Sequence, residues 1–346
     1  MIAEEDKKSD GCQRREAPSG AAYRLHDMSE ILLEARDLTK EFPAGRKKKV
    51  HAVSGVSLKI FRGETLGLVG ESGCGKSTLG RMLIRLIRPD SGQLQVLGED
   101  VTKLSDKEFA KYRRQLQLVF QDPYASLDPR LNVRDLIAEP LRTWHTCKTK
   151  EELTKRVLEL MDDVGVPGEF LFRFPHQFSG GQRQRIGIAR ALAADPELIV
   201  CDEPVSALDA TVQNQILNLL KKLQKSRGLT YLFISHDLSV VRHISDRVCI
   251  MFLGMLCEVG ETKEVFQKPL HPYTRFLLNA ILLPDPHHRH DENELLAGEI
   301  PSAVNPPSGC RFHTRCPYAT KQCETQVPQM REMNGREVAC HNPLTE

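Results

Sequence analysis

The stretch LGLVGESGCGKST, residues 66–78, decides the fold. An apolar run ends at Gly70, and a loop with the pattern G-x-x-x-x-G-K-[ST] follows it directly. Between a strand and a helix, such a loop turns consecutive N–H groups and the positive helix end toward phosphate oxygens. The alternative, a glycine-rich turn without a ligand, is improbable for so long a match. We expect a nucleotide site formed by Gly70, Glu71, Ser72, Gly73, Cys74, Gly75, Lys76, Ser77 and Thr78.

Two side chains of this loop have predicted roles. Lys76 should reach the β and γ phosphates, and the Ser77 hydroxyl should bind Mg²⁺. A second apolar strand, residues 198–201, ends in Asp202 and Glu203. Asp202 suits the carboxylate that organises Mg²⁺, and Glu203 can polarise the attacking water as a general base.

A second predicted phosphate contact begins at Ser179. Ser179, Gly180, Gly181 and Gln182 precede a long helical pattern, so several helix-terminal N–H groups are exposed with little side-chain obstruction. The alternative is an ordinary helix cap with a flexible entry. The order of the motifs along the chain favours the phosphate contact.

The wider pattern predicts an α/β fold. Short apolar strands alternate with helices, which indicates a mainly parallel sheet covered on both faces. Residues of about 121–195 are predominantly helical, and one stripe joins Leu153, Val157, Leu160, Met161 and Val164. We divide the chain into a mobile tail (1–29), a nucleotide-binding domain (30–263, helical subdomain about 121–195) and a proline-rich, irregular C-terminal region (264–346).

Composition limits the class of protein. With 27% charged and 40% hydrophobic residues, the bulk of the chain is not disordered. The net charge of +2 gives no sign of a nucleic-acid partner. The longest mostly apolar stretch, 248–257, is half of the about 20 residues that span a bilayer. The start of the chain lacks the features of a secretory signal, so we expect a cytoplasmic location.

Together, these motifs resemble the ATP-binding subunits of ABC transporters, from Ile31 to Val265. FSGGQ at 178–182 is similar to the family signature, with Phe in place of Leu. The resemblance implies a P-loop ABC ATPase domain with an antiparallel β element and a helical subdomain. It also implies roles for four further residues. Gln121 resembles the Q-loop glutamine, a catalytic residue and Mg²⁺ ligand, and His236 resembles the switch histidine. Asp209 ends a segment similar to the D-loop (206–209) and is expected among the nucleotide-binding residues, and Phe42 matches the aromatic that stacks on adenine. A lone phenylalanine is a core residue as often as a ligand contact.

The family resemblance also implies a head-to-tail pair of ATPase subunits, in which each ATP lies between the loop of one and the signature of the other. QDPYASLDPR (121–130) and HPYT (271–274) are similar to the dipeptide and oligopeptide importers, a group that includes nickel importers. Residues 63–81 look more like the second, F-type ATPase subunit. The implied partners are a related second ATPase, two transmembrane permeases and an extracytoplasmic peptide-binding protein, and the implied location is the cytoplasmic face of the inner membrane.

Four of the ten cysteines lie in the last 37 residues, as C-x5-C-x6-C-x16-C: Cys310, Cys316, Cys323 and Cys340. Four thiolates suit zinc or an iron–sulfur cluster. Structural zinc usually takes cysteines two to four residues apart, and the wide spacing here favours a larger inorganic core. The region also resembles the C-terminal part of peptide-importer ATPases, which implies a [4Fe-4S] cluster. Zinc and free thiols are the alternatives.

Import of peptides, energised by ATP hydrolysis, is the leading functional hypothesis. The first rival is import of nickel or another small solute. A second rival is an ABC ATPase of translation or DNA repair, although neither a second cassette nor a long coiled coil is evident. A third is a cluster-bearing scaffold with a vestigial ATPase, against which Lys76, Glu203 and His236 argue.

Overall fold

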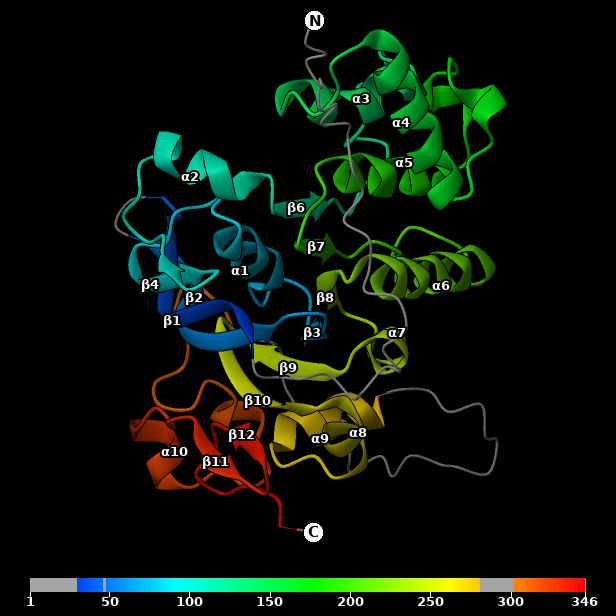
Figure 1. Ribbon diagram of the computed structural model, residues 1–346. Helices are drawn as coiled ribbons and strands as arrows, with labels where there is room; N and C mark the ends of the chain where they lie inside the picture. The colour runs from blue at the N-terminus through cyan, green and yellow to red at the C-terminus, as the bar shows by residue number, and fades with distance from the viewer. Residues whose placement is uncertain (1–29, 46–47, 281–300, 346) are drawn as a thin grey trace, which may run out of the picture.

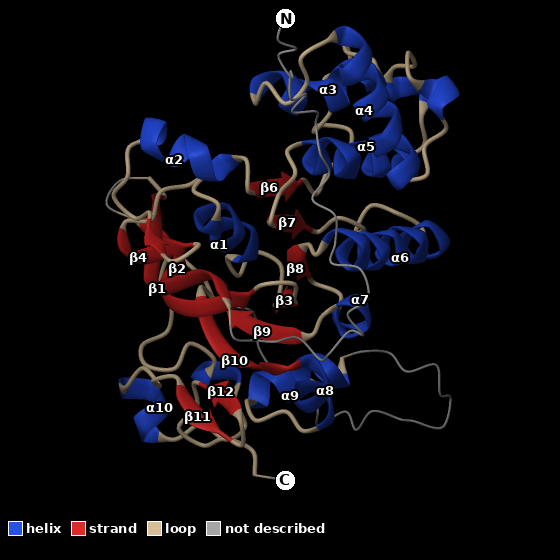
Figure 2. Ribbon diagram, viewed as in Figure 1, coloured by secondary structure: helices blue, strands red, loops and turns tan. Residues whose placement is uncertain are grey.

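The computed structural model describes residues 30–45, 48–280 and 301–345. The expected mobile tail, residues 1–29, lies outside them. The described chain forms a sheet with the strand order β11-β12-β10-β9-β3-β8-β7-β6 and a smaller antiparallel sheet with the order β2-β1-β4-β5 (Figures 1 and 2). Five neighbouring strands of the larger sheet are parallel: β3 (Thr65–Val69), β6 (Leu116–Val119), β7 (Leu198–Asp202), β8 (Thr230–Ser235) and β9 (Arg247–Phe252).

Both faces of the parallel strands are covered, as the continuous apolar runs predicted. Every residue of β3, β7 and β8 is buried. Alternate residues of a strand point to opposite faces, and in β7 Leu198 and Val200 join one apolar cluster while Ile199 and Cys201 join the other. The first cluster contains α1 (Lys76–Leu83), and the second contains α6 (Ala210–Arg227) and α7 (Leu238–Ile244). Helices therefore pack on both faces of the parallel strands, and the loops that follow these strands start from a fixed framework.

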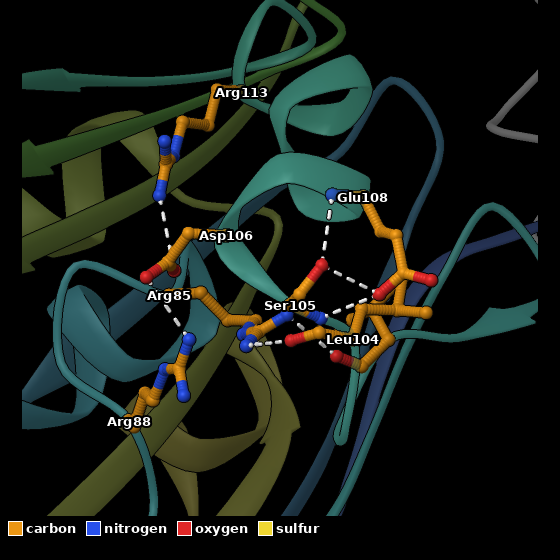
Figure 3. A network of polar contacts seen from close by, with 8 residues as sticks. Arg85, Arg88, Leu104, Ser105, Asp106, Glu108 and Arg113 are labelled. Atoms are coloured by element: carbon orange, nitrogen blue, oxygen red, sulfur yellow. Dashed lines mark hydrogen bonds and ion pairs between the residues drawn. The ribbon is translucent and has the colours of Figure 1, made fainter.

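The smaller sheet is the expected antiparallel β element. Its strands are β1 (Ile31–Pro43), β2 (Lys49–Phe61), β4 (Ser91–Val96) and β5 (Glu99–Asp100). The helix α2 (Asp106–Arg113) follows it and begins with a capping box, in which the Ser105 hydroxyl accepts from the Glu108 N–H and the Glu108 carboxylate accepts from the Ser105 N–H. Figure 3 shows this cap and the Asp106 carboxylate between Arg88 and Arg113.

The helical subdomain forms a separate lobe beside β6 and β7 (Figure 1). It contains α3 (Val133–Thr143), α4 (Lys150–Asp163) and α5 (Gly180–Ala193), with short 3-10 turns η1 (Gly168–Phe170) and η2 (Pro175–Gln177). All five residues of the predicted apolar stripe on 153–164 are buried in the core of this lobe. The amphipathic pattern was therefore a correct guide to its packing.

The C-terminal region packs against β10 (Met255–Glu261), which is antiparallel to β9. It contains α8 (Thr262–Gln267), α9 (Pro272–Asn279), η4 (His313–Arg315), α10 (Lys321–Thr325), β11 (Arg331–Met333) and β12 (Arg336–Val338). The strand β12 pairs with β10, so the last residues extend the large sheet. The predicted boundary at residue 263 falls within α8.

One buried carboxylate connects the C-terminal region to β10. Glu258 is 0% exposed and accepts hydrogen bonds from the N–H groups of Leu270 and His271 and from the Arg336 guanidinium. Burial raises the pKa of Glu258 above its ordinary value. In the described part of the chain, no helix has the length and apolar character needed to cross a membrane.

Candidate functional site

The phosphate loop joins β3 to α1 and requires glycine for two reasons. Gly73 and Gly75 have φ of 76° and 107°, which favour glycine. A Cβ on Gly70 would lie 2.0 Å from the Met251 carbonyl oxygen, and a Cβ on Gly75 would lie 2.0 Å from that of Ala52. Neighbouring backbone thus lies so close to Gly70 and Gly75 that neither position has room for a side chain.

Lys76 begins α1 and turns back into the loop. Its ammonium donates to the carbonyl oxygens of Gly70 at 2.7 Å and Glu71 at 2.9 Å, and the residue is buried. These two carbonyls hold the positive charge inside the loop. The arrangement suits binding of phosphate oxygens, as predicted for Lys76.

The two predicted Mg²⁺ ligands on adjacent strands are in contact. The Ser77 hydroxyl donates to Oδ1 of Asp202 at 2.6 Å, and Arg81 lies 3.4 Å from the other carboxylate oxygen. Asp202 is buried at the end of β7. A hydroxyl and a carboxylate oxygen are hard donors of the kind that Mg²⁺ binds, so these side chains fit that ion.

The predicted catalytic residues meet at the Glu203 carboxylate. Gln121 Nε2 donates to Glu203 Oε2 at 3.0 Å, and His236 Nδ1 lies 3.3 Å from the same oxygen. Glu203 has φ of 46°, a conformation that costs a side chain of this kind about 1 kcal/mol or more. Its N–H donates to the Ile234 carbonyl of β8, which holds this turn in place. Three elements thus bring one carboxylate and two polar groups to the same sheet edge.

The signature residues cap α5 in the helical subdomain. The Ser179 hydroxyl accepts from the Gln182 N–H at 3.4 Å, and the Gln182 side-chain oxygen accepts from the Ser179 N–H at 3.1 Å. A Cβ on Gly181 would lie 2.3 Å from Val212 Cγ1, and Gly180 packs near Leu208. No hydrogen bond among the described residues links this segment to the phosphate loop of the same chain.

Two other predicted ligand contacts lie elsewhere. Asp209 caps α6, since its carboxylate accepts from the Val212 N–H at 3.0 Å. Phe42 lies on β1, is partly exposed, and has the Lys40 ammonium 5.6 Å from its ring centre. A partly exposed ring is accessible to a ligand, whereas a core phenylalanine would be covered.

The four C-terminal cysteines line one small cavity. Cys310, Cys316, Cys323 and Cys340 surround it with His271, Phe312 and neighbouring polar residues. Burial raises the pKa of Cys316 to about 11 and that of Cys340 to about 12, and the nearby cysteines contribute to both shifts. Within residues 30–45, 48–280 and 301–345, no set of three histidine, cysteine or acidic side chains has the geometry to hold a metal ion.

Sequence reasoning missed two contacts of the phosphate loop. Arg315 forms an ion pair with Glu71 at 3.2 Å, and the Tyr273 hydroxyl accepts from the Glu71 N–H at 3.1 Å. Tyr273 belongs to the HPYT segment, whose similarity to the peptide importers gave no indication of a contact with the phosphate loop. Arg315 lies between two predicted cysteine ligands, and no local pattern connects it with a loop 244 residues away.

Comparisons with known proteins place these features in a family. Residues 53–206 match the ABC transporter family, and residues 257–323 match the C-terminal region of oligopeptide/dipeptide transporters. Two solved structures are similar to this chain. One is the dimeric cassette MJ0796 in a post-hydrolysis state bound to ADP and Pi (31% identity, TM-score 0.61, 66% of this chain and 98% of that chain). The other is cbiO1 from Clostridium perfringens, part of the ABC transporter complex cbiONQ (29%, 0.62, 69% and 91%).

Curated relatives cover nearly the whole chain. The putative oligopeptide transport ATP-binding protein YkfD of Bacillus subtilis is 54% identical over 90% of this chain and 95% of its own length. The oligopeptide transport ATP-binding protein OppF of Salmonella typhimurium is 47% identical over 91% of this chain and 97% of its own. On this similarity and on the site described above, the chain belongs to the ABC transporter ATPases, among the oligopeptide transport ATP-binding proteins.

Proposed function

We propose that this chain hydrolyses ATP to energise the import of dipeptides or oligopeptides through partner permeases. The observation that carries the catalytic half is the meeting of Gln121, Glu203 and His236 next to the Ser77–Asp202 contact. The peptide half is supported by the match of residues 257–323 and by the names of the curated relatives. Nickel or another small solute is the alternative cargo.

In the proposed mechanism, residues 70–78 and Lys76 bind the phosphates, and the partly exposed Phe42 ring stacks on adenine. Ser77, Asp202 and Gln121 would hold Mg²⁺, which would supply positive charge to neutralise the phosphates. Glu203 accepts a proton from the attacking water, and Gln121 and His236 orient the carboxylate and the γ phosphate. When Gln121 and His236 turn toward the nucleotide, the Glu203 carboxylate can accept this proton.

We further propose that the site is completed by a second ATPase subunit, most simply a related chain in a heterodimer. Ser179, Gly180, Gly181 and Gln182 would then bind the γ phosphate held by the partner, with Asp209 at the interface. Among the residues that the structure describes, no hydrogen bond joins 179–182 to the chain's own phosphate loop, which supports the proposal that this helix start is available to a partner. Because the γ phosphate would contact both subunits, ATP would bind the closed pair more tightly than the open one. Hydrolysis would remove this contact and allow the pair to reopen.

The four cysteines are proposed to hold a [4Fe-4S] cluster, with zinc as the less favoured occupant. All four line one cavity, which fits a shared inorganic core. Four thiolates are the usual ligand set of such a cluster. Bound there, it would cross-link a region rich in prolines. We keep 30–263 and 264–346 as the proposed domain division.

The proposed location is peripheral, at the cytoplasmic face of the inner membrane, with two permeases and an extracytoplasmic peptide-binding protein as partners. Glu203→Gln tests the function in proteoliposomes that contain the purified complex. We expect ATP hydrolysis and peptide uptake to fall together by about 10²-fold or more, since a general base contributes that much. Glu332→Gln, an exposed carboxylate on β11, is the control. Full ATP turnover in Glu203→Gln would reject the proposed catalytic role of Glu203. Uptake of Ni²⁺ but no peptide by the unaltered complex would reject peptides as the cargo.

A further inference from the structure

The C-terminal domain contacts the phosphate loop through a buried ion pair. Arg315 ends the short turn η4 between Cys310 and Cys316, and its Nη1 lies 3.2 Å from each carboxylate oxygen of Glu71. The side chains of Arg315 and Glu71 are only 7% and 18% exposed. Because little water surrounds the pair, salt screens it less than an ion pair on the surface.

The backbone of the same loop residue is held as well. The Glu71 N–H donates to the hydroxyl of Tyr273, which is fully buried. The Tyr273 ring packs against Phe252 at 4.7 Å and against Phe312 at 5.2 Å between ring centres. Phe312 begins the turn that ends in Arg315. One aromatic cluster thus fixes both groups that contact Glu71.

A second arginine strengthens this connection. Arg311 donates to the Leu253 carbonyl and to the Ser54 hydroxyl, the latter at 2.9 Å. Gly254, which follows Leu253, donates its N–H to the Cys74 carbonyl of the phosphate loop at 2.8 Å. The segment from Cys310 to Cys316 therefore contacts the loop directly at Glu71 and indirectly at Cys74.

The charge on Glu71 matters because the loop must accept the phosphates of a nucleotide. A carboxylate within the same loop repels them, and in a partly buried site this repulsion is stronger than in water. Arg315 cancels that charge without placing another cation among the phosphate ligands. Removal of either partner leaves one net charge beside the site, negative without Arg315 and positive without the Glu71 carboxylate.

We propose that Arg315 is a positioning residue for nucleotide binding: it neutralises Glu71 and, together with Tyr273, braces the phosphate loop from the C-terminal domain. The inference rests on the proposed role of residues 70–78 in binding phosphate. It adds that nucleotide affinity depends on a side chain outside the ABC motifs.

The test is calorimetric titration of the full-length chain with MgADP, which cannot be hydrolysed. We expect Arg315→Ala to raise the Kd by about three- to tenfold and Glu71→Gln to lower it by a similar factor, since the free arginine then attracts phosphate. The double variant should bind within about twofold of the unaltered chain. Lys321→Ala, which removes an exposed positive charge of the same domain, is the control.

The order of the four Kd values decides between a charge effect and a merely structural one. If the pair only stabilises the loop, either single change breaks it, so both would weaken binding and the double variant would not recover. That result, or an unchanged Kd in Arg315→Ala, would overturn the inference. If Arg315→Ala does not fold, Glu71→Gln decides alone, because tighter binding is expected only from the charge effect. Lys76→Ala tests the phosphate loop itself: MgADP binding that survives in that variant rejects the proposed site rather than the role of Arg315.

Discussion

The buried pair between Arg336 and Glu258 predicts how strongly the C-terminal domain is held to the sheet. Arg336→Ala leaves the Glu258 carboxylate, which is 0% exposed, without the cation that compensates its charge, although the N–H groups of Leu270 and His271 still donate to it. Removal of one partner of a buried pair costs about 3–5 kcal/mol. At about 1.4 kcal/mol per factor of ten, local opening becomes about 10²- to 10⁴-fold more frequent.

The stability lost in Arg336→Ala is expected to depend on pH. Burial raises the pKa of Glu258, and loss of the arginine raises it further. Below the unfolded pKa of about 4.3, both states are protonated and the charge penalty is absent. As the pH rises from there to the folded pKa, the unfolded state ionises first and stability falls. The penalty in Arg336→Ala should therefore be larger at pH 8 than at pH 5.

Amide hydrogen exchange, corrected for the intrinsic rate at each pH, measures this opening. The probe is the pairing of β10 with β12, which includes the hydrogen bond from the Ala339 N–H to the Cys257 carbonyl. Lys321→Ala, a change of an exposed cation on α10, should leave protection unchanged. Equal protection in Arg336→Ala and the unaltered chain at pH 8, or a greater loss at pH 5, would refute the reasoning.

Three further predictions concern the nucleotide-binding domain. Ser105→Ala removes the cap of α2 and should lower the free energy of unfolding by about 1 kcal/mol in urea titrations, while Ser105→Asp should retain most of it. Gly75→Ala places a Cβ 2.0 Å from the Ala52 carbonyl oxygen in a left-handed conformation, so MgADP binding should be lost in calorimetry although circular dichroism stays unchanged. Burial raises the pKa of Cys249 to about 12, so iodoacetamide should not alkylate it at pH 8 in the folded chain and should do so in urea; alkylation in the folded chain at that pH would contradict its burial.

Local patterns predicted most of the nucleotide-binding domain. The loop from Gly70 to Thr78 specifies its own strand–loop–helix geometry, and the apolar runs of β7 and β8 identify buried parallel strands without further information. The strand end predicted Glu203, and the family resemblance implied Gln121 and His236. Their meeting at one carboxylate is seen only in the structure, where the ends of neighbouring strands lie at one edge of the sheet. The stripe on α4 predicted its buried face for the same local reason.

Contacts between distant segments could not be predicted in this way. Arg336 is 78 residues from Glu258, and Arg315 is 244 residues from Glu71. A lone arginine in a polar, proline-rich stretch does not indicate its partner. The strands β11 and β12 have three residues each, too few for an alternating pattern. Whether the four cysteines bind a cluster also depends on distances that spacing along the chain does not set.

The contact between Glu71 and Arg315 also bears on the order in which the protein is made. The two residues are 244 positions apart, so at about 5–20 residues per second the ribosome adds Arg315 about 12–50 s after Glu71. During that interval the nascent chain has its glycine-rich loop but lacks the cation that offsets the loop's carboxylate. A growing polypeptide should therefore bind nucleotide about three- to tenfold more weakly, as expected for Arg315→Ala, until Arg315 has been added.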